Sequence, residues 1–204
     1  KNYGTQVWML ENLKTTKYNN GDLIGTTASP TLNYFGESAP KYQWAYNGDE
    51  SYAAIYGRLY TWYAATDNRK ICPTGWHLPT DEEWTIFTDF LTENGFGFEG
   101  SGNDIAKSIA SSGWGLDPTP GVVGNDQVSN NSSGFTAVPA GSRTTDGFYS
   151  LNYNCFWWTA TEVTELPVPD CAWFRFLHTY TSVLIKDYSG LNKSYGYSVR
   201  CLKD

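Results

Sequence analysis

Apolar residues three and four positions apart predict a helix that starts at Thr80. Trp84, Phe87 and Leu91 share this spacing, so one face of the helix is apolar and must pack against a large core. The start carries a capping box, because the side chains of Thr80 and Glu83 can each bond the backbone N–H of the other residue. We expect this helix to organise the rest of the domain.

The same spacing predicts two further helices. Aromatic residues recur at helical intervals within residues 57–67, and the Asp-Asn pair there would end that helix. We interpret this aromatic stripe as core, in preference to a sugar-stacking platform. A short helix is expected over residues 104–111. Residues 116–133 have no periodicity and are rich in Pro, Gly, Asn and Ser, which is typical of an irregular excursion on a rigid scaffold.

Alternation of apolar and polar residues predicts strands, most of them after residue 135. The expected strands cover residues 6–12, 42–46, 135–143, 156–161, 172–177, 182–185 and 197–202. Asp146-Gly147 is a hairpin signal, and short connections favour antiparallel pairing. Early helices followed by a run of strands predict an α+β fold, in which two to three helices pack on antiparallel strands as one domain over residues 1–204.

Charge and hydropathy argue against several classes of partner. The net charge is −7 and the pI is about 4.8. Phosphate backbones and anionic membrane surfaces are bound by clustered Lys and Arg, and the chain has no such cluster, so we expect no nucleic-acid partner. No segment approaches the roughly 18 apolar residues that a transmembrane helix requires. We therefore expect a domain without a transmembrane segment.

Four cysteines without a C-x-x-C spacing predict two disulfides in preference to a zinc site. Two disulfides imply an oxidising compartment. The three pairings of Cys72, Cys155, Cys171 and Cys201 stay open on spacing alone. No signal peptide is present at Lys1, so we expect a mature or trimmed form and infer export.

The chain carries no recognisable catalytic or metal-binding motif. His77 and His178 are the only histidines, and neither stands near a G-x-S-x-G or H-E-x-x-H motif. We interpret His77 as a buried hydrogen-bonding residue. Asp49 and Glu50 fall far short of the roughly six to eight oxygens that calcium requires. The prediction is no enzyme activity, no metal and no cofactor.

Several motifs, in a fixed order, resemble a known family. They are WMLENL at 8–13, GRLYTW at 57–62, CPTGWHLP at 72–79, WWTATE at 157–162 and SVRC at 198–201. In this order they resemble the Fibrobacter succinogenes major paralogous domain family, and the likeness runs from about residue 1 to the C-terminus.

The resemblance implies a C-type lectin-like fold on secreted or surface proteins of Bacteroidetes and Fibrobacteres. In lectin-like domains a disulfide joins the helix region to the last strand. This favours Cys72–Cys201 and leaves Cys155–Cys171, two residues on neighbouring expected strands. Glu165–Asp170 lies where such domains carry a calcium-dependent sugar loop. Two prolines separate its acids and no Trp-Asn-Asp follows, so calcium is not predicted there.

The expected function is binding. We predict a non-catalytic secreted or cell-surface domain whose leading ligand is a glycan, by analogy of fold. The alternative is a protein–protein adhesion or structural module of a surface assembly. A third hypothesis is an enzyme related to formylglycine-generating enzymes, which have a distantly similar fold but need free active-site cysteines. A lipid anchor N-terminal to Lys1 is a candidate tether.

The binding face is expected in loops at the end of the late strands. In lectin-like domains the loops at one end of these strands make the recognition face, which here would draw on residues 143–153 and 162–170. A guanidinium and aromatic rings can stack on and hydrogen-bond to a sugar or a partner chain. The competing interpretation lays the tyrosines over the sheet edge and pairs the arginine with Asp146. The candidate ligand-binding residues are Arg143, Tyr149, Tyr153 and Trp158.

Overall fold

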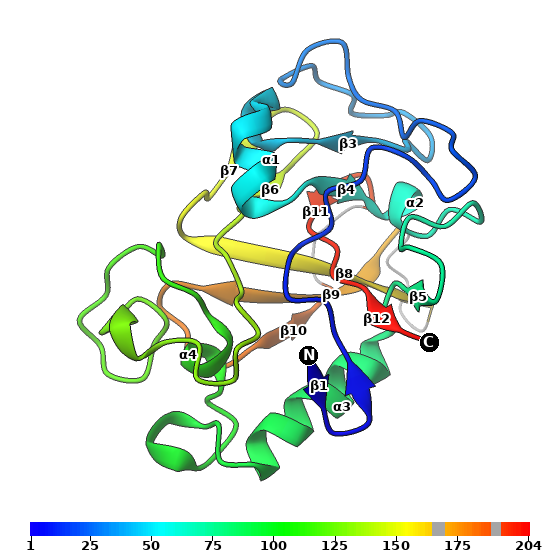
Figure 1. Cartoon of the computed structure of the whole chain (residues 1–204). Coiled ribbons are helices and arrows are strands. Elements are labelled where there is room, and N and C mark those ends of the chain that lie inside the picture. The colour runs from blue at the N-terminus through cyan, green and yellow to red at the C-terminus, as the bar shows by residue number, and fades with distance from the viewer. Residues whose placement is uncertain (165–169, 189–192) are drawn as a thin grey trace.

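The computed structural model describes residues 1–164, 170–188 and 193–204, which form an α+β fold (Figure 1). The α-helices are α1 (Glu50–Tyr56), α2 (Trp62–Ala65), α3 (Asp81–Glu93) and α4 (Ala106–Ile109). The strands are β1 (Asn2–Tyr3), β2 (Gln6–Val7), β3 (Gln43–Trp44), β4 (Leu59–Thr61), β5 (Trp76–His77), β6 (Ser142–Arg143), β7 (Phe148–Tyr149), β8 (Asn154–Glu162), β9 (Ala172–His178), β10 (Ile185–Asp187), β11 (Gly196–Tyr197) and β12 (Leu202–Lys203).

A long antiparallel pair of strands, β8 and β9, crosses the centre of the molecule (Figure 1). β10 pairs with the other edge of β9. Side chains alternate between the two faces of a strand, so the neighbours Trp157 and Trp158 point in opposite directions. Trp157 joins the hydrophobic cluster that contains the buried side of α3, whereas Trp158 joins a second cluster with Tyr197 of β11. The hairpin therefore separates two cores.

The helix predicted from Thr80 is α3, and its capping box is confirmed. The Glu83 N–H donates to Thr80 Oγ1 (3.2 Å), and the Thr80 N–H donates to Glu83 Oε2 (2.7 Å). Trp84, Phe87 and Leu91 are fully buried. Local sequence chemistry and tertiary packing thus agree at this helix.

Thr80→Ala is expected to lower the free energy of unfolding by about 1 kcal/mol, because the variant loses the N-cap bond to Glu83. Urea unfolding measures the change. Thr88→Ala is the matched control in the same helix, since the Thr88 hydroxyl donates only to the Thr85 carbonyl, and its change should stay within about 0.5 kcal/mol. An unchanged midpoint in Thr80→Ala would show that the capping box adds nothing.

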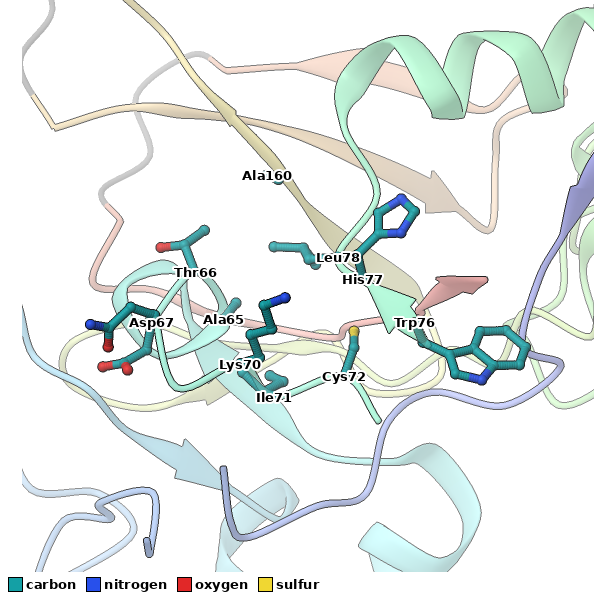
Figure 2. A pocket seen from close by; sticks show the side chains of 11 residues that line it. Ala65, Thr66, Asp67, Lys70, Ile71, Cys72, Trp76, His77, Leu78 and Ala160 are labelled. Carbon is teal, nitrogen blue, oxygen red and sulfur yellow. The ribbon is translucent and has the colours of Figure 1, made fainter. Parts of the chain in front are cut away.

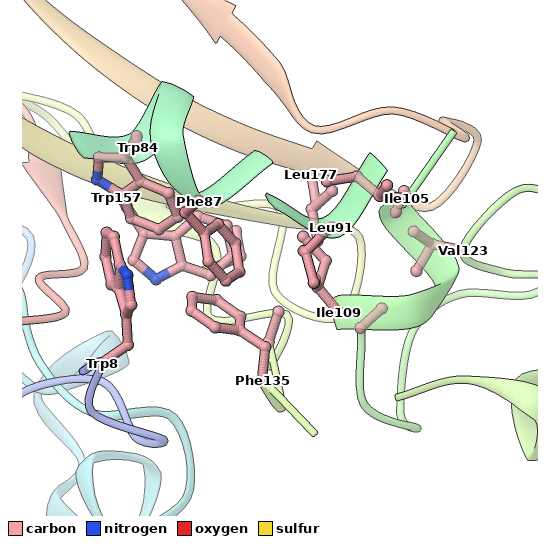
Figure 3. Packing of buried hydrophobic residues seen from close by; sticks show 14 of the residues in the cluster. Trp8, Trp84, Phe87, Leu91, Ile105, Ile109, Val123, Phe135, Trp157 and Leu177 are labelled. Carbon is pink, nitrogen blue, oxygen red and sulfur yellow. The ribbon is translucent and has the colours of Figure 1, made fainter. Parts of the chain in front are cut away.

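The apolar face of α3 packs into an aromatic cluster (Figure 3). The ring centre of Trp84 lies 4.5 Å from Trp8, 5.9 Å from Phe135 and 5.8 Å from Trp157. These rings come from the N-terminal segment, α3, an irregular segment before β6, and β8. The cluster therefore joins parts of the chain that are far apart in sequence.

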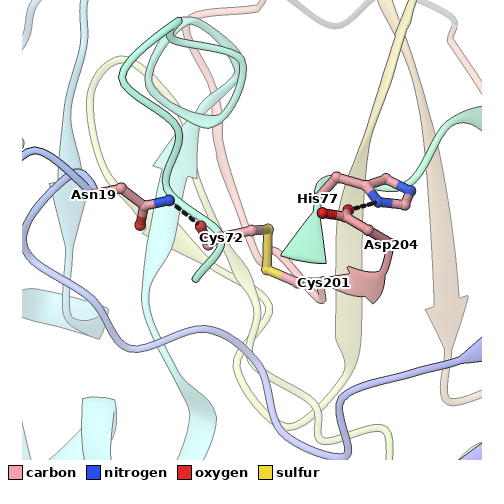
Figure 4. Close-up of a disulfide and its surroundings, with 5 residues drawn as sticks. All are labelled: Asn19, Cys72, His77, Cys201 and Asp204. Atoms are coloured by element: carbon pink, nitrogen blue, oxygen red, sulfur yellow. Dashed lines mark hydrogen bonds and ion pairs between the residues drawn. A yellow bond between two sulfur atoms is a disulfide. The ribbon is translucent and has the colours of Figure 1, made fainter. Parts of the chain in front are cut away.

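The last strand lies against both the N-terminal segment and the region before α3. β12 pairs with β5, and Trp8 forms a single bridge to Leu202. A disulfide joins Cys72 to Cys201 with an S–S distance of 2.04 Å, which confirms the first predicted pairing (Figure 4). Residues 129 positions apart in sequence are thereby linked next to α3.

The predicted Cys155–Cys171 disulfide is wrong. Cys155 lies at the start of β8, opposite Leu177, whereas Cys171 directly precedes β9 and accepts a hydrogen bond from Val163 beyond the other end of β8. An antiparallel register puts these positions at opposite ends of the hairpin, about seven residue steps or more than 20 Å apart. A disulfide needs Cα atoms within about 7 Å. Both cysteines are buried, and no bond joins them.

The predicted helix over residues 57–67 is also wrong. Residues 50–56 form α1, and Gly57, with a φ of 80°, ends it. A Cβ at Gly57 would lie 2.5 Å from Cβ of Asn12, so only glycine fits. β4 follows and pairs with both β3 and β11, and α2 begins after Thr61. Pairing on both sides of β4 overrides the helical spacing of its aromatic residues.

The predicted third helix is α4, which is shorter than expected.

Several predicted strands are shorter or absent. Residues 135–138 form no strand, since only Ala137 makes a single bridge, to Ala110. The predicted strand 197–202 is divided into β11 and β12. Between β11 and β12 the backbone of residues 198–201 forms hydrogen bonds with the backbones of Met9, Leu13 and Phe156. It does not continue one ladder with a single strand, because the segment passes between two sheets.

Candidate ligand-binding surface

Arg143 is placed by β6 in the interior and not at the surface. Its side chain is fully buried, donates to the carbonyl of Leu32 (2.8 Å) and to that of Thr144, and lies within 5.3 Å of the ring centres of Tyr34 and Trp44. Burial lowers the pKa of Arg143. The guanidinium is therefore a structural group that ties three segments together, and its role as a ligand-binding residue is not compatible with this position.

Trp158 is also in the interior. Its ring is fully buried, 4.4 Å from the ring of Tyr197, and its Nε1 donates to the carbonyl of Tyr60 (2.9 Å). Trp157 is equally buried on the other face of β8. Neither ring can contact a ligand at the surface, so the prediction for Trp158 is corrected by its burial.

The described ends of the two loops predicted to form one binding face lie at opposite ends of β8. Residues 143–153 precede β8 and residues 163–164 follow it, and β8 spans nine residues. At about 3.3 Å per residue the two ends of β8 are about 30 Å apart. Residues 165–169 of the second loop are outside the described residues, so their part in a binding face stays a prediction.

Tyr149 and Tyr153 are the predicted residues that reach the surface, each with 48% of its area exposed. The ring of Tyr149 lies against Gly147, in the β6–β7 hairpin that the Asp146-Gly147 pair predicted. The ring of Tyr153 packs on Gly115, where an added Cβ would lie 2.6 Å from it. Among the described residues, the rings of Tyr149 and Tyr153 make no contact with each other.

A row of aromatic rings lies beside Tyr153 and was not predicted. We call Phe148, Tyr46, Tyr52 and Tyr56 the tyrosine row. Successive ring centres are 5.2, 5.8 and 6.0 Å apart. The hydroxyl of Tyr56 donates to Asn152 Oδ1 (3.1 Å), the residue before Tyr153. Tyr52, Tyr56 and Phe148 are partly exposed, whereas Tyr46 is buried.

The sequence contains a signal for this row. Asp49 caps α1, since its Oδ1 accepts from the Ser51 N–H at 2.9 Å. Tyr52 and Tyr56 then stand four positions apart, a spacing that stacks side chains on one helix face. A helix predicted from residue 57 onward leaves out this spacing. The interpretation of the aromatic stripe as core holds in part for Tyr56, because this residue packs against the α3 cluster.

A hollow of about 390 Å³ opens beside the disulfide (Figure 2). Its walls come from α2, the following loop, β5 and β8. The lining residues are Ala65, Thr66, Asp67, Asn68, Lys70, Ile71, Cys72, Trp76, His77, Leu78 and Ala160.

His77 borders this hollow and lies between two carboxylates. Its Nδ1 is 2.7 Å from an oxygen of Asp204 (Figure 4). Its Nε2 is 3.0 Å from an oxygen of Glu83. Burial lowers the pKa of His77, but the bonds to Asp204 and Glu83 outweigh it and raise the pKa above the ordinary 6.5. The ring therefore links the capping box of α3 to the end of β12. The interpretation as a buried hydrogen-bonding residue is confirmed in part, because the ring is only half-buried.

His77→Gln is expected to remove a pH-dependent part of the stability. Because the folded pKa is raised, this part is fully present below about pH 6.5 and is lost as the pH rises through the folded pKa. His178 acts with the opposite sign, since burial lowers its pKa. The measurement is therefore the difference in urea midpoint between wild type and variant between about pH 5 and pH 9. A difference that stays constant over this range would contradict the prediction.

The two cysteines outside the disulfide lie in surroundings that disfavour a thiolate. Burial raises the pKa of Cys155 to about 12 and also raises that of Cys171. The sequence argument against an enzyme of the formylglycine-generating type depends on the pairing of all four cysteines, and for these two it fails. Their burial still disfavours the thiolate, which is the reactive form of cysteine.

Metal-binding clusters and membrane-spanning helices are not found among the described residues. Residues 1–164, 170–188 and 193–204 contain no group of three or more His, Cys, Asp or Glu side chains placed to hold a metal ion. Within the same ranges no helix has the length and apolar character needed to cross a membrane.

Comparison with known proteins gives one match. Residues 2–203 match the family model described as the Fibrobacter succinogenes major domain. No curated protein and no solved structure matches the chain.

Proposed function

The chain belongs to the Fibrobacter succinogenes major domain family, as its motifs predicted, and from this premise we propose that it is a non-catalytic glycan-binding domain. It is secreted or anchored at the cell surface, and its fold is a variant of the C-type lectin-like arrangement. The glycan lies along the tyrosine row. The alternative ligand is a surface protein held by the same rings.

The tyrosine row is the observation that carries this proposal. Tyr52 and Tyr56 are stacked at 6.0 Å with 27° between their planes, and Tyr56 is tied to Asn152. Rigid aromatic rings offer contact area at a small entropic cost and keep a polar hydroxyl at the rim. A carbohydrate chain presents alternating apolar ring faces and hydroxyls, which a row of this kind can match.

The absence of catalysis is supported by how the reactive side chains are held. Both ring nitrogens of His77 are bonded to carboxylates, so neither is available as a general base for a substrate. Burial raises the pKa of Cys155 to about 12, which keeps its thiol protonated at neutral pH. A nucleophile activated by an adjacent base would need the opposite arrangement.

Export and the lectin-like arrangement are supported by the disulfide. Disulfides persist mainly in oxidising compartments. Cys72–Cys201 links the region before α3 to the last strands, which is the bridge expected of lectin-like domains. The N-terminal segment bridges the same C-terminal strand at Trp8. The disulfide and the Trp8 bridge both attach other segments to the C-terminal strands. The end of the β8–β9 hairpin opposite to these attachments is left for recognition.

An oligosaccharide array followed by titration calorimetry tests the proposal. Tyr52→Ala and Tyr56→Ala should each weaken binding of an array-positive oligosaccharide about tenfold, because a stacked ring contributes about 1 to 2 kcal/mol. Phe35→Ala is the matched control, since Phe35 is an exposed ring outside the row. Saturable binding of equal affinity in all three variants would show that the glycan site lies outside the tyrosine row. An array without any saturable ligand would favour the protein-adhesion alternative.

A further inference from the structure

The hollow beside the disulfide has an apolar floor and one cation that points into it (Figure 2). The ammonium of Lys70 is directed toward Leu78, across the open space. The volume of about 390 Å³ falls in the range of sites that bind small molecules. The apolar floor is made by Ala65, Ile71, Cys72, Leu78 and Ala160.

Lys70 is held in an uncommon backbone conformation. Its φ is 58°, in the left-handed region that residues other than glycine and asparagine adopt at a cost. Its N–H donates to the carbonyl of Asp67 (2.8 Å), and its carbonyl accepts from the N–H of Asn19 (2.9 Å). These bonds hold the turn and so direct the side chain toward the hollow.

Lys70 is exposed to solvent, and its charge is not paired within the part of the chain that the structure describes. Its ammonium makes no ion pair or hydrogen bond to residues 1–164, 170–188 or 193–204. The carboxylate of Asp67 is already bonded by Arg69 through both oxygens and paired with Lys41. Arg69 and Lys41 hold the pKa of Asp67 well below its usual range. Glu83 and Asp204, which do not line the hollow, are bonded to the His77 ring.

We propose that this hollow binds a small molecule with an apolar chain and one carboxylate. The apolar chain lies on the floor of the hollow and the carboxylate pairs with the Lys70 ammonium. This site is separate from the tyrosine row and does not depend on a glycan ligand. The same chemistry is offered by a free alkyl carboxylate and by the C-terminal residue of a peptide that ends in an aliphatic side chain.

Titration calorimetry with sodium octanoate and with 1-octanol tests the charge requirement. Wild-type protein should bind octanoate saturably and about two- to fivefold more tightly than octanol, because the exposed Lys70 ammonium attracts the carboxylate through a solvent-screened ion pair. Lys70→Met keeps the length of the side chain and removes the charge, so the variant should bind both molecules equally. Lys17→Met is the matched control, since Lys17 is exposed and does not line the hollow.

The position of the site and the source of the carboxylate are tested separately. Ala160→Leu fills the hollow and should abolish octanoate binding while the urea midpoint of the protein is unchanged or raised. A peptide ending in Leu-Val with a free carboxylate, compared with its amide, shows whether a chain terminus binds more tightly than octanoate. Equal octanoate affinity in wild type and Lys70→Met, or no saturable binding of octanoate and of the peptide, would overturn the proposal.

Discussion

Removal of the Cys72–Cys201 disulfide is expected to lower the free energy of unfolding by about 4 to 5 kcal/mol. The bond links residues 129 positions apart, so in the unfolded chain it closes a long loop and removes much of its conformational entropy. The double substitution Cys72→Ala with Cys201→Ala suits this test because both positions are buried in an apolar cluster. Urea unfolding without reductant measures the difference.

Reductant provides the control for this result. Dithiothreitol should shift the wild-type midpoint to that of the double variant and leave the double variant unchanged. Cys155→Ala leaves the disulfide intact, so this variant should keep the full response to reductant. Equal midpoints of wild type and double variant under oxidising conditions would contradict the expectation.

Trp84→Ala is expected to lower the free energy of unfolding by about 3 to 5 kcal/mol. The ring is fully buried and contacts Trp8, Phe87, Phe135 and Trp157, with ring centres 4.5 to 5.9 Å away. Removal of the indole leaves a cavity that rings from several distant segments cannot fill by local movement. Guanidinium or urea unfolding with an unchanged slope measures the loss.

Two variants separate cavity formation from other effects. Ile86→Ala changes an exposed residue of the same helix and should stay within about 0.5 kcal/mol of wild type. Trp84→Phe keeps a ring and removes an indole N–H that has no hydrogen-bond partner among the described residues, so its loss should be much smaller. A Trp84→Ala loss no larger than that of Ile86→Ala would show that α3 is not part of the main core.

The elements predicted correctly are those that local chemistry specifies. α3 was predicted with its cap because Thr80 and Glu83 interact within four residues and Trp84 follows at helical spacing. The central strands were predicted because β8 and β9 are long runs of aromatic and β-branched residues. The hairpin at Asp146-Gly147 follows from turn chemistry alone.

The elements predicted wrongly are those whose partners are distant in sequence. The aromatic spacing of residues 59–63 fits a helix, but β3 and β11 pair with both edges of β4 and impose extended backbone. Cys155 is in β8, and Cys171 directly precedes the adjacent strand β9. Antiparallel register places them at opposite ends, and spacing in the sequence does not encode that register.

The surface could not be predicted for a related reason. A side chain's type indicates what it can bind, but only the packed fold decides whether it reaches solvent. Arg143 and Trp158 are fully buried, while Tyr153 is exposed beside the tyrosine row. The row itself combines two residues of α1 with Tyr46, which precedes α1, and with Phe148 of β7, and no one of these segments alone marks it as a surface.

By itself, the sequence determined the family, the α+β class, the capped helix and the cysteine pair that the family resemblance favours. These depend on contacts within a few residues or on the order of motifs along the chain. The tertiary structure alone decided which aromatic residues face solvent, where the strands end and how the hollow at Lys70 is lined. Each of these depends on long-range register and packing, because burial is a property of all the segments that meet at a position.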